Sequence, residues 1–213
     1  MNIGWIARGY RWIEYLAFGR ALERCRFVHL EFLPNLHSIL LLGEGDGRFL
    51  ARLASLQPDA CFDVVDNSHE MVALASSRLT ASQRIRVQFH ALDARSAALP
   101  ETSYDLVATN FVLDCFDEVE AARVVARVSN HVRSGGLWLV SEFQQPRGGI
   151  RRLHATLWIR AMYLFFRATT GLRVNRVPAY GLMLTDAGFE LARENRWRWG
   201  LIVSQLWLKT TLR

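Results

Sequence analysis

Residues 38–50 read SILLLGEGDGRFL, and this stretch decides the fold. An apolar run leads into glycines at alternate positions, Gly43, Gly45 and Gly47, and an apolar helical pattern begins at Phe49. The order predicts a buried strand, a tight turn and a helix N-terminus. Glycine tolerates positive φ and lets a ligand approach the backbone, toward which the free N–H groups of the helix start point.

The spacing of these glycines indicates which ligand the turn suits. A dinucleotide-binding G-x-G-x-x-G motif requires its third glycine at position 48, where this chain has Arg48. Glu44 and Asp46 lie inside the turn and would repel a pyrophosphate. The turn therefore favours a ligand with little negative charge, and an ordinary strand-to-helix turn is the alternative.

The composition predicts one α/β domain. The chain has 213 residues, of which 51% are hydrophobic, enough for a substantial core. The start does not read as a signal peptide, and the longest apolar block, residues 157–166, is too short to span a bilayer. The whole chain has three cysteines, and this odd, widely spaced set argues against disulfides and CxxC metal sites. We expect a cytoplasmic, reducing location and no metal.

Strand and helix patterns alternate along most of the chain. Helical spacing covers residues 5–33, 49–56, 68–79, 117–132, 150–168 and 179–187, and a turn is expected at 134–136. The predicted strands are residues 38–42, 61–66, 85–92, 104–110, 137–143, 188–196 and 199–209. This rhythm predicts parallel βαβ units in a doubly wound sheet, which binds ligands at the carboxyl ends of its strands.

Polar residues follow successive strands at this edge. Asp66 ends the second strand, where a carboxylate can accept both hydroxyls of an adenosine ribose. Ser68 is a suitable helix N-cap, and Met71 could cover an adenine face or belong to the core. Asp93 could accept the exocyclic N–H of adenine or be an exposed loop acid, and Asn110 ends the fourth strand.

Five segments resemble, in order, the motifs of class I S-adenosylmethionine-dependent methyltransferases. They are LLLGEGDGRF, VVDNSHEM, ALDA, YDLVATNFVL and SGGLWLVSEF, within about residues 38–145. Both ends of the chain are loosely similar to the ubiquinone/menaquinone-biosynthesis type. The expected fold is a Rossmann-like, mostly parallel sheet of seven strands, the last antiparallel, with an N-terminal helical cap. Residues 1–35 would form this cap, 36–145 the cofactor-binding core, 146–187 an acceptor or lid insertion and 188–213 the final strand pair of a single domain.

The resemblance implies S-adenosylmethionine as cofactor and a role for each motif. The glycine turn would lie beneath the methionine portion, Asp66 would hold the ribose, and Asn110 would lie beside the methionine amino group. The implied cofactor-binding residues are Gly43, Glu44, Gly45, Asp46, Gly47, Asp66, Asn67, Ser68, Met71, Asp93, Ala94, Asn110 and Phe111. The family usually has an acid where this chain has Leu41, so Glu44 or water would have to substitute for it.

Residues 146–176 differ from the rest of the chain in composition, because they hold seven arginines, no acid and many aromatic residues. Methyltransferases of this type build their acceptor pocket in this part of the chain. The expected acceptor-binding residues are Tyr10, Phe18, Asp114, Trp158, Met162 and Tyr163. Asp114 is the first candidate for a general base and His154 the second, although Asp114 could instead be a helix-start acid. The arginines could contact an anionic membrane or simply be solvated.

The predicted function is methyl transfer from S-adenosylmethionine to a small hydrophobic acceptor that is quinone-, phenol- or lipid-like. The net charge of +6 suggests a nucleic-acid methyltransferase as an alternative. The run Asn110-Phe111-Val112-Leu113 lacks the prolines usual in amino-methylating members, so no nucleic acid is expected. A non-catalytic cofactor-binding protein is the other alternative, favoured by Leu41. The cytoplasmic location leaves open a peripheral contact with the inner membrane face, and the oligomeric state is left open as well.

Overall fold

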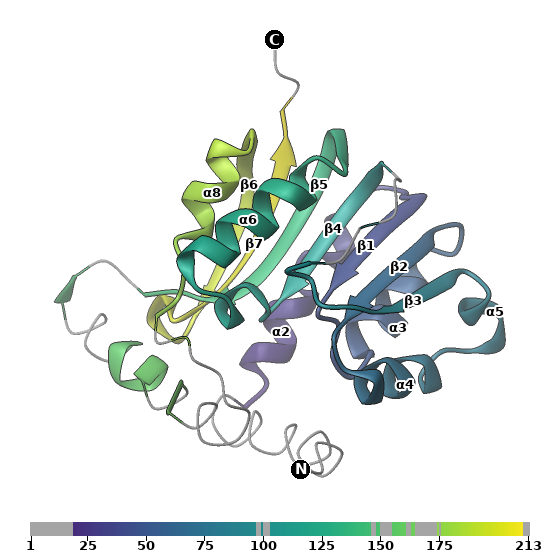
Figure 1. Cartoon of the computed structure of the whole chain (residues 1–213), viewed down its shortest axis with the longest axis horizontal. Coiled ribbons are helices and arrows are strands. Elements are labelled where there is room, and N and C mark those ends of the chain that lie inside the picture. The colour runs from purple at the N-terminus through teal and green to yellow at the C-terminus, as the bar shows by residue number, and fades with distance from the viewer. Residues whose placement is uncertain are drawn as a thin grey trace.

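The computed structural model describes residues 19–96, 99, 103–145, 148–149, 155–160, 163–164, 174 and 176–210. They form one seven-stranded sheet in the order β3-β2-β1-β4-β5-β7-β6 (Figure 1). The strands are β1 Ser38–Leu42, β2 Cys61–Asp66, β3 Val87–Ala91, β4 Tyr104–Asn110, β5 Val132–Phe143, β6 Phe189–Trp197 and β7 Ile202–Lys209. Only β7 runs antiparallel to its neighbours, so the predicted fold class is confirmed.

Helices cover both faces of the sheet. The α-helices are α2 Ala21–Phe27, α3 Arg48–Leu56, α4 His69–Ser77, α5 Ala81–Arg84, α6 Glu118–Ser129 and α8 Tyr180–Asp186. Three short 3-10 turns are η1 Leu30–Phe32, η2 Leu113–Cys115 and η3 Arg198–Gly200. The near face in Figure 1 packs against α6 and α8, and the far face packs against α3 and α4. Strands β1 and β4 lie at the centre and are almost wholly buried, as their apolar runs predicted.

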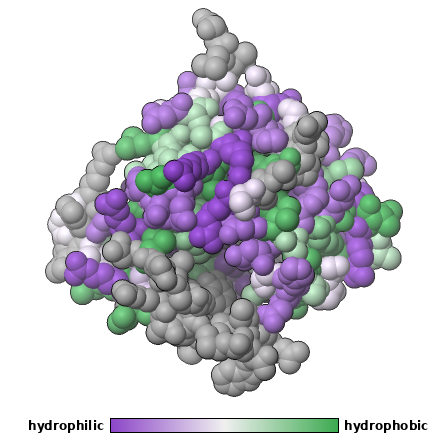
Figure 2. Space-filling model, viewed as in Figure 1, coloured by the Kyte–Doolittle hydropathy of each residue, from purple (hydrophilic) through white to green (hydrophobic). Residues whose placement is uncertain are grey.

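A third apolar cluster joins α2 to the end of β5, the start of β7 and residues 155–163. Because β1 to β5 are parallel, their carboxyl ends meet at one edge, which faces α2 and α4 on the lower side of Figure 1. Hydrophilic side chains cover much of the face seen in Figure 2, with hydrophobic ones in small groups among them. None of the helices in the described part of the chain is long and apolar enough to cross a bilayer.

Several predicted boundaries were wrong. Strand β5 begins at Val132 rather than at residue 137, so residues 134–136 lie within the strand and not in a separate turn. The register of β4 against β5 shifts between Tyr104 and Leu106, and the glycines are among the extra residues of β5 at this point. Helix α6 stops at Ser129 because Lys209 Nζ donates to the carbonyls of Ser129 and Val132, which closes the helix end. Helix α5 was not predicted. Within residues 150–168, positions 155–160 and 163–164 are helical, and the others lie outside the described residues.

The predicted N-terminal helices are described only in their second half, as α2 and η1. Residues 1–18 lie outside the described residues. The division of the chain into cap, core, insertion and final strand pair stays a prediction.

Candidate functional site

The glycine turn uses its three glycines in two ways. All have positive φ: 64° at Gly43, 67° at Gly45 and 81° at Gly47. A Cβ on Gly43 would lie 2.4 Å from Val112 Cγ2, and one on Gly47 would lie 2.4 Å from Ala75 Cα. A Cβ on Gly45 would meet no atom within 4 Å. The outer glycines therefore permit close packing, and the middle one borders open space that fits a ligand against the backbone.

Glu44 contacts the start of helix α3. Its Oε1 accepts the N–H of Leu50 at 2.8 Å, which caps α3 because the N-cap residue Gly47 has no side chain. Burial raises the pKa of this carboxyl to about 8. Leu41 is 1% exposed and packs in the core beneath the turn. One carboxyl oxygen of Glu44 is engaged in this cap, and its substitution for an acid at position 41 stays a prediction.

Asp66 connects the ends of β1 and β2. Its two carboxyl oxygens accept the N–H groups of Gly45 at 3.0 Å and Ser68 at 2.9 Å, and burial raises its pKa. The Ser68 hydroxyl caps α4 by accepting the Met71 N–H, as predicted. Asn67 is exposed and Met71 half-buried next to this carboxylate. Asp66, the predicted ribose-binding residue, thus lies beside Gly45, and the roles of Asn67 and Met71 at the adenine stay predictions.

Two other acids of the expected cofactor set are paired with arginines. Asp93 contacts the Arg95 guanidinium at 3.1 Å, which holds the pKa of the carboxyl below its usual range. Asp46 pairs with Arg48 at 2.8 Å and Arg78 at 3.1 Å, which ties the turn to the end of α4. The backbone carbonyl of Ala94 accepts a hydrogen bond from Arg127 of α6. Contacts of Asp46, Asp93 and Ala94 with a cofactor stay predictions.

Asn110 and Phe111 lie at the end of β4 beside α2. Asn110 is buried, and its Oδ1 has no hydrogen-bond partner among the described residues. The Phe111 N–H donates to the Ser141 carbonyl at 2.7 Å. The guanidinium carbon of Arg26, on α2, lies 5.1 Å from the centroid of the Phe111 ring. The charge of Arg26 also acts to lower the pKa of Glu44, so Arg26 lies near the glycine turn as well as beside Phe111. No sequence signal identified Arg26, because its position depends on how α2 packs.

Asp114 and Glu142 form a buried acidic pair beyond β4. Asp114 is 6% exposed, and burial raises its pKa to about 6. Glu142, near the end of β5, is 0% exposed, and burial together with the charge of Asp114 raises its pKa well above the usual range. The Tyr163 hydroxyl donates to the Asp114 backbone carbonyl at 3.1 Å. Asp114 and Tyr163, both predicted to bind the acceptor, are therefore in contact, and their roles stay predictions. The sequence analysis missed Glu142.

Of the other predicted acceptor residues, the structure describes only Trp158. Trp158 is 37% exposed on the helix of residues 155–160. Tyr10, Phe18, His154 and Met162 lie outside the described residues, so their roles stay predictions. Within the described ranges, no group of three or more His, Cys, Asp or Glu side chains is arranged to hold a metal ion.

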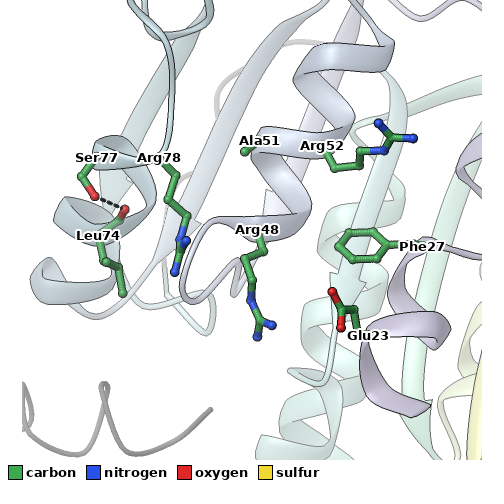
Figure 3. A pocket seen from close by; sticks show the side chains of 8 residues that line it. All are labelled: Glu23, Phe27, Arg48, Ala51, Arg52, Leu74, Ser77 and Arg78. Atoms are coloured by element: carbon green, nitrogen blue, oxygen red, sulfur yellow. Dashed lines mark hydrogen bonds between the residues drawn. The ribbon is translucent and has the colours of Figure 1, made fainter. Parts of the chain in front are cut away.

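A surface groove of about 900 Å³ lies between α2, α3 and α4, away from the acidic pair (Figure 3). It is lined by Glu23, Phe27, Arg48, Ala51, Arg52, Leu74, Ser77 and Arg78. None of these residues belongs to the predicted cofactor or acceptor set. Two of its lining residues, Arg48 and Arg78, pair with Asp46 of the glycine turn, so the groove adjoins the back of that turn.

Comparison with known proteins agrees with this fold. Residues 39–136 match the family described as a methyltransferase domain. Acetylserotonin O-methyltransferase of Bos taurus is 31% identical over 156 residues, 73% of this chain and 43% of that protein. An O-methyltransferase family protein of Burkholderia thailandensis superposes with a TM-score of 0.71 at 19% identity, over 93% of this chain and 59% of that one. The N-methyltransferase NodS of Bradyrhizobium japonicum WM9, solved with S-adenosyl-L-homocysteine, superposes with a TM-score of 0.64 at 13% identity, over 89% of this chain and 84% of that one.

The chain therefore contains a class I S-adenosylmethionine-dependent methyltransferase domain, and S-adenosylmethionine is the cofactor of this class of enzyme. This chain spans less than half the length of the bovine relative and about six-tenths of the Burkholderia one.

Proposed function

We propose that this chain transfers the methyl group of S-adenosylmethionine to a hydroxyl group of a small, apolar, phenol-like acceptor. The observation that carries the proposal is Asp114, a buried carboxyl at the carboxyl edge of the sheet with a pKa of about 6. A general base works best when its pKa lies near the working pH. The names of the bovine and Burkholderia relatives, both O-methyltransferases, support a hydroxyl acceptor.

The chemistry asks little of the protein beyond alignment. Bound S-adenosylmethionine supplies an electrophilic methyl group on its sulfonium. Asp114 accepts the acceptor's hydroxyl proton as the oxygen–methyl bond forms and the sulfur–methyl bond breaks, which leaves S-adenosylhomocysteine and a methyl ether. Holding the two reactants in line supplies roughly 7–11 kcal/mol. Gly45, Asp66 and Asn110 would hold the cofactor, and Phe111 and Tyr163 would border the acceptor.

Incubation with radiolabelled S-adenosylmethionine and a panel of acceptors tests the proposal. The panel should contain phenols, with N-acetylserotonin among them, a quinol, an amine and RNA. Label in a phenol supports the proposal. Label in the quinol supports the part of the proposal that makes the acceptor hydrophobic. Transfer only to the amine or RNA, or cofactor binding with no transfer at all, contradicts it.

Asp66→Ala is expected to weaken S-adenosylhomocysteine binding by about 1–3 kcal/mol, because two ribose hydroxyls and the Gly45 N–H lose their acceptor. Isothermal calorimetry measures the change. Asp59→Ala, at an exposed acid just before β2, is the matched control and should bind normally. Normal affinity in folded Asp66→Ala would remove Asp66 from the site.

Arg26→Ala is expected to weaken S-adenosylhomocysteine binding roughly 10–100-fold, because a guanidinium near the glycine turn and beside Phe111 would pair with the carboxylate of the ligand's amino-acid end. Binding of 5′-methylthioadenosine, which lacks that end, should not change. Arg24→Ala, exposed on the same helix, controls for loss of charge. An equal loss for both ligands would assign Arg26 to packing instead.

Contact with an anionic membrane stays a prediction. Of the seven arginines between residues 146 and 176, only Arg160 and Arg176 lie within the described residues, and both are exposed. Leu157 and Leu164 are 60% and 70% exposed nearby in sequence, which is compatible with an apolar contact.

A further inference from the structure

Glu142 is a buried acid with a defined set of partners. It is 0% exposed, and its Oε1 accepts the N–H groups of Val112 at 2.9 Å and Leu113 at 2.7 Å. Its Oε2 has no hydrogen-bond partner among the described residues. Burying a carboxyl is costly unless it satisfies groups that would otherwise be left without partners. Here those groups belong to the segment that leads from β4 to Asp114.

This segment has an uncommon backbone conformation. Phe111 has φ of 58°, a region that residues other than glycine rarely adopt. Three successive N–H groups, of residues 111, 112 and 113, are held by two successive residues of β5. Ser141 accepts the first through its backbone carbonyl, and Glu142 accepts the other two through its side chain. Strand β5 thus imposes the turn that follows β4.

The same turn connects the cofactor side of the site to the acceptor side. Val112 packs on the glycine turn so closely that a Cβ on Gly43 would lie 2.4 Å from Val112 Cγ2. Leu113 begins η2, whose middle residue is Asp114. Tyr163 then donates to the Asp114 carbonyl from the opposite side. A shift of residues 112–113 would therefore move Asp114 relative to the glycine turn.

We propose that Glu142 is a positioning residue, whose side chain fixes Val112 and Leu113 and thereby places Asp114 against the acceptor. The proposal rests on the proposed function of Asp114 as the base.

The electrostatics of the pair agree with this division of roles. Burial and the charge of Asp114 raise the pKa of Glu142 well above its usual range, whereas the Asp114 pKa is about 6. The two carboxyls therefore do not both ionise near neutral pH, and the direction of the two shifts favours the neutral form on Glu142. The titratable groups that interact with the pair include Cys25, Cys115, Tyr163 and Tyr180, and the raised pKa values of all four keep them neutral. Arg95 is a charged group that acts on Cys115. Glu142 can act through its reach and its hydrogen bonds without a second negative charge.

Two variants of Glu142 separate the effect of side-chain length from that of charge. Glu142→Gln keeps the length of the side chain and an accepting oxygen but cannot ionise. Glu142→Asp keeps a carboxyl but is one methylene shorter and cannot hold both N–H groups in place. We expect Glu142→Gln to keep kcat within about 3-fold and the lower limb of the pH profile near pH 6. Glu142→Asp should lose at least about 100-fold in kcat, with the S-adenosylhomocysteine Kd within about 3-fold of wild type.

The assay uses the acceptor that the wild type methylates best, and Glu190→Asp, at an exposed glutamate of β6, is the matched control. Loss of kcat in Glu142→Gln with retention in Glu142→Asp would overturn the proposal in favour of a charge role. Normal kcat in both variants, with only a lower Tm, would reduce Glu142 to a structural residue.

A second measurement does not require an acceptor. Hydrogen exchange of the Val112 and Leu113 amides, followed by NMR with S-adenosylhomocysteine bound, should quicken at least 10-fold in Glu142→Asp and stay near wild type in Glu142→Gln. Unchanged exchange in Glu142→Asp would overturn the proposal. A wild type that transfers no methyl group would instead contradict the proposed function, whatever the exchange rates show.

Discussion

Asp114→Asn is expected to lower the rate of methyl transfer by about 10²–10⁴-fold and, at the same time, to stabilise the protein. The loss of rate follows from removing a positioned general base. The gain in stability follows from burial, since Asp114 is 6% exposed and its pKa rises from 3.8 to about 6 on folding. Asparagine has nearly the same shape and carries no charge.

The sign of the stability effect depends on pH. Between about pH 4 and pH 6 the folded protein binds a proton at Asp114 that the unfolded chain has released, so stability falls as pH rises through this window. Above pH 6 the buried carboxylate costs up to about 3 kcal/mol, from a pKa shift of about two units. Asp114→Asn should therefore raise the free energy of unfolding at pH 8 and leave it unchanged below pH 4.

Urea denaturation at pH 8 and pH 4, together with the methyl-transfer assay at pH 8, measures both effects. Asp186→Asn, at an exposed acid that ends α8, is the control and should change neither. A stable but fully active Asp114→Asn would exclude the base. A variant destabilised at pH 8 would mean that the carboxylate makes favourable contacts that outweigh its burial.

Gly47→Ala is expected to cost about 2–5 kcal/mol of stability, a large part of the roughly 5–15 kcal/mol by which native proteins are stable. Its φ of 81° is unfavourable for alanine by about 1–2 kcal/mol. The added Cβ would lie 2.4 Å from the backbone Cα of Ala75, so α3 and α4 would have to move apart, at about 1–3 kcal/mol. Because the clash is with the backbone of α4, a change of side-chain rotamer cannot relieve it.

Gly45→Ala is the matched variant, because its φ is also positive but its Cβ meets nothing within 4 Å. We expect it to fold, with a loss of about 1–2 kcal/mol, and to bind S-adenosylhomocysteine at least 10-fold more weakly. Thermal unfolding and calorimetry on both variants provide the comparison. Wild-type affinity in Gly45→Ala would show that the open space beside the turn is not the cofactor's place.

The order of strands and helices follows from local sequence, and so does the edge where ligands bind. The run from Ser38 to Leu42 and the glycines after it predicted β1, the turn and α3, because side-chain periodicity and positive φ are properties of neighbouring residues. Parallel strands must end at a common edge, so Asp66 and Asn110 could be placed there without a structure.

The roles of individual acids depended on contacts distant in sequence. Glu44 and Asp66 lie in or next to the same turn, yet one caps α3 and the other holds the Gly45 N–H. Glu142 stands near the end of β5 just as Asp66 stands at the end of β2, so a signal existed, but the pattern could not tell a partly buried acid from a fully buried one.

Only the packing of β5 against the segment after β4 buries Glu142 beside Asp114 and gives the two carboxyls different pKa values. Likewise, only the docking of α2 brings Arg26 to Phe111. Sequence periodicity sets which face of an element is apolar, whereas desolvation and charge pairing depend on which other element covers that face. For this reason the sequence by itself determined the fold and the cofactor edge, and the tertiary structure decided which residues there have the geometry for catalysis.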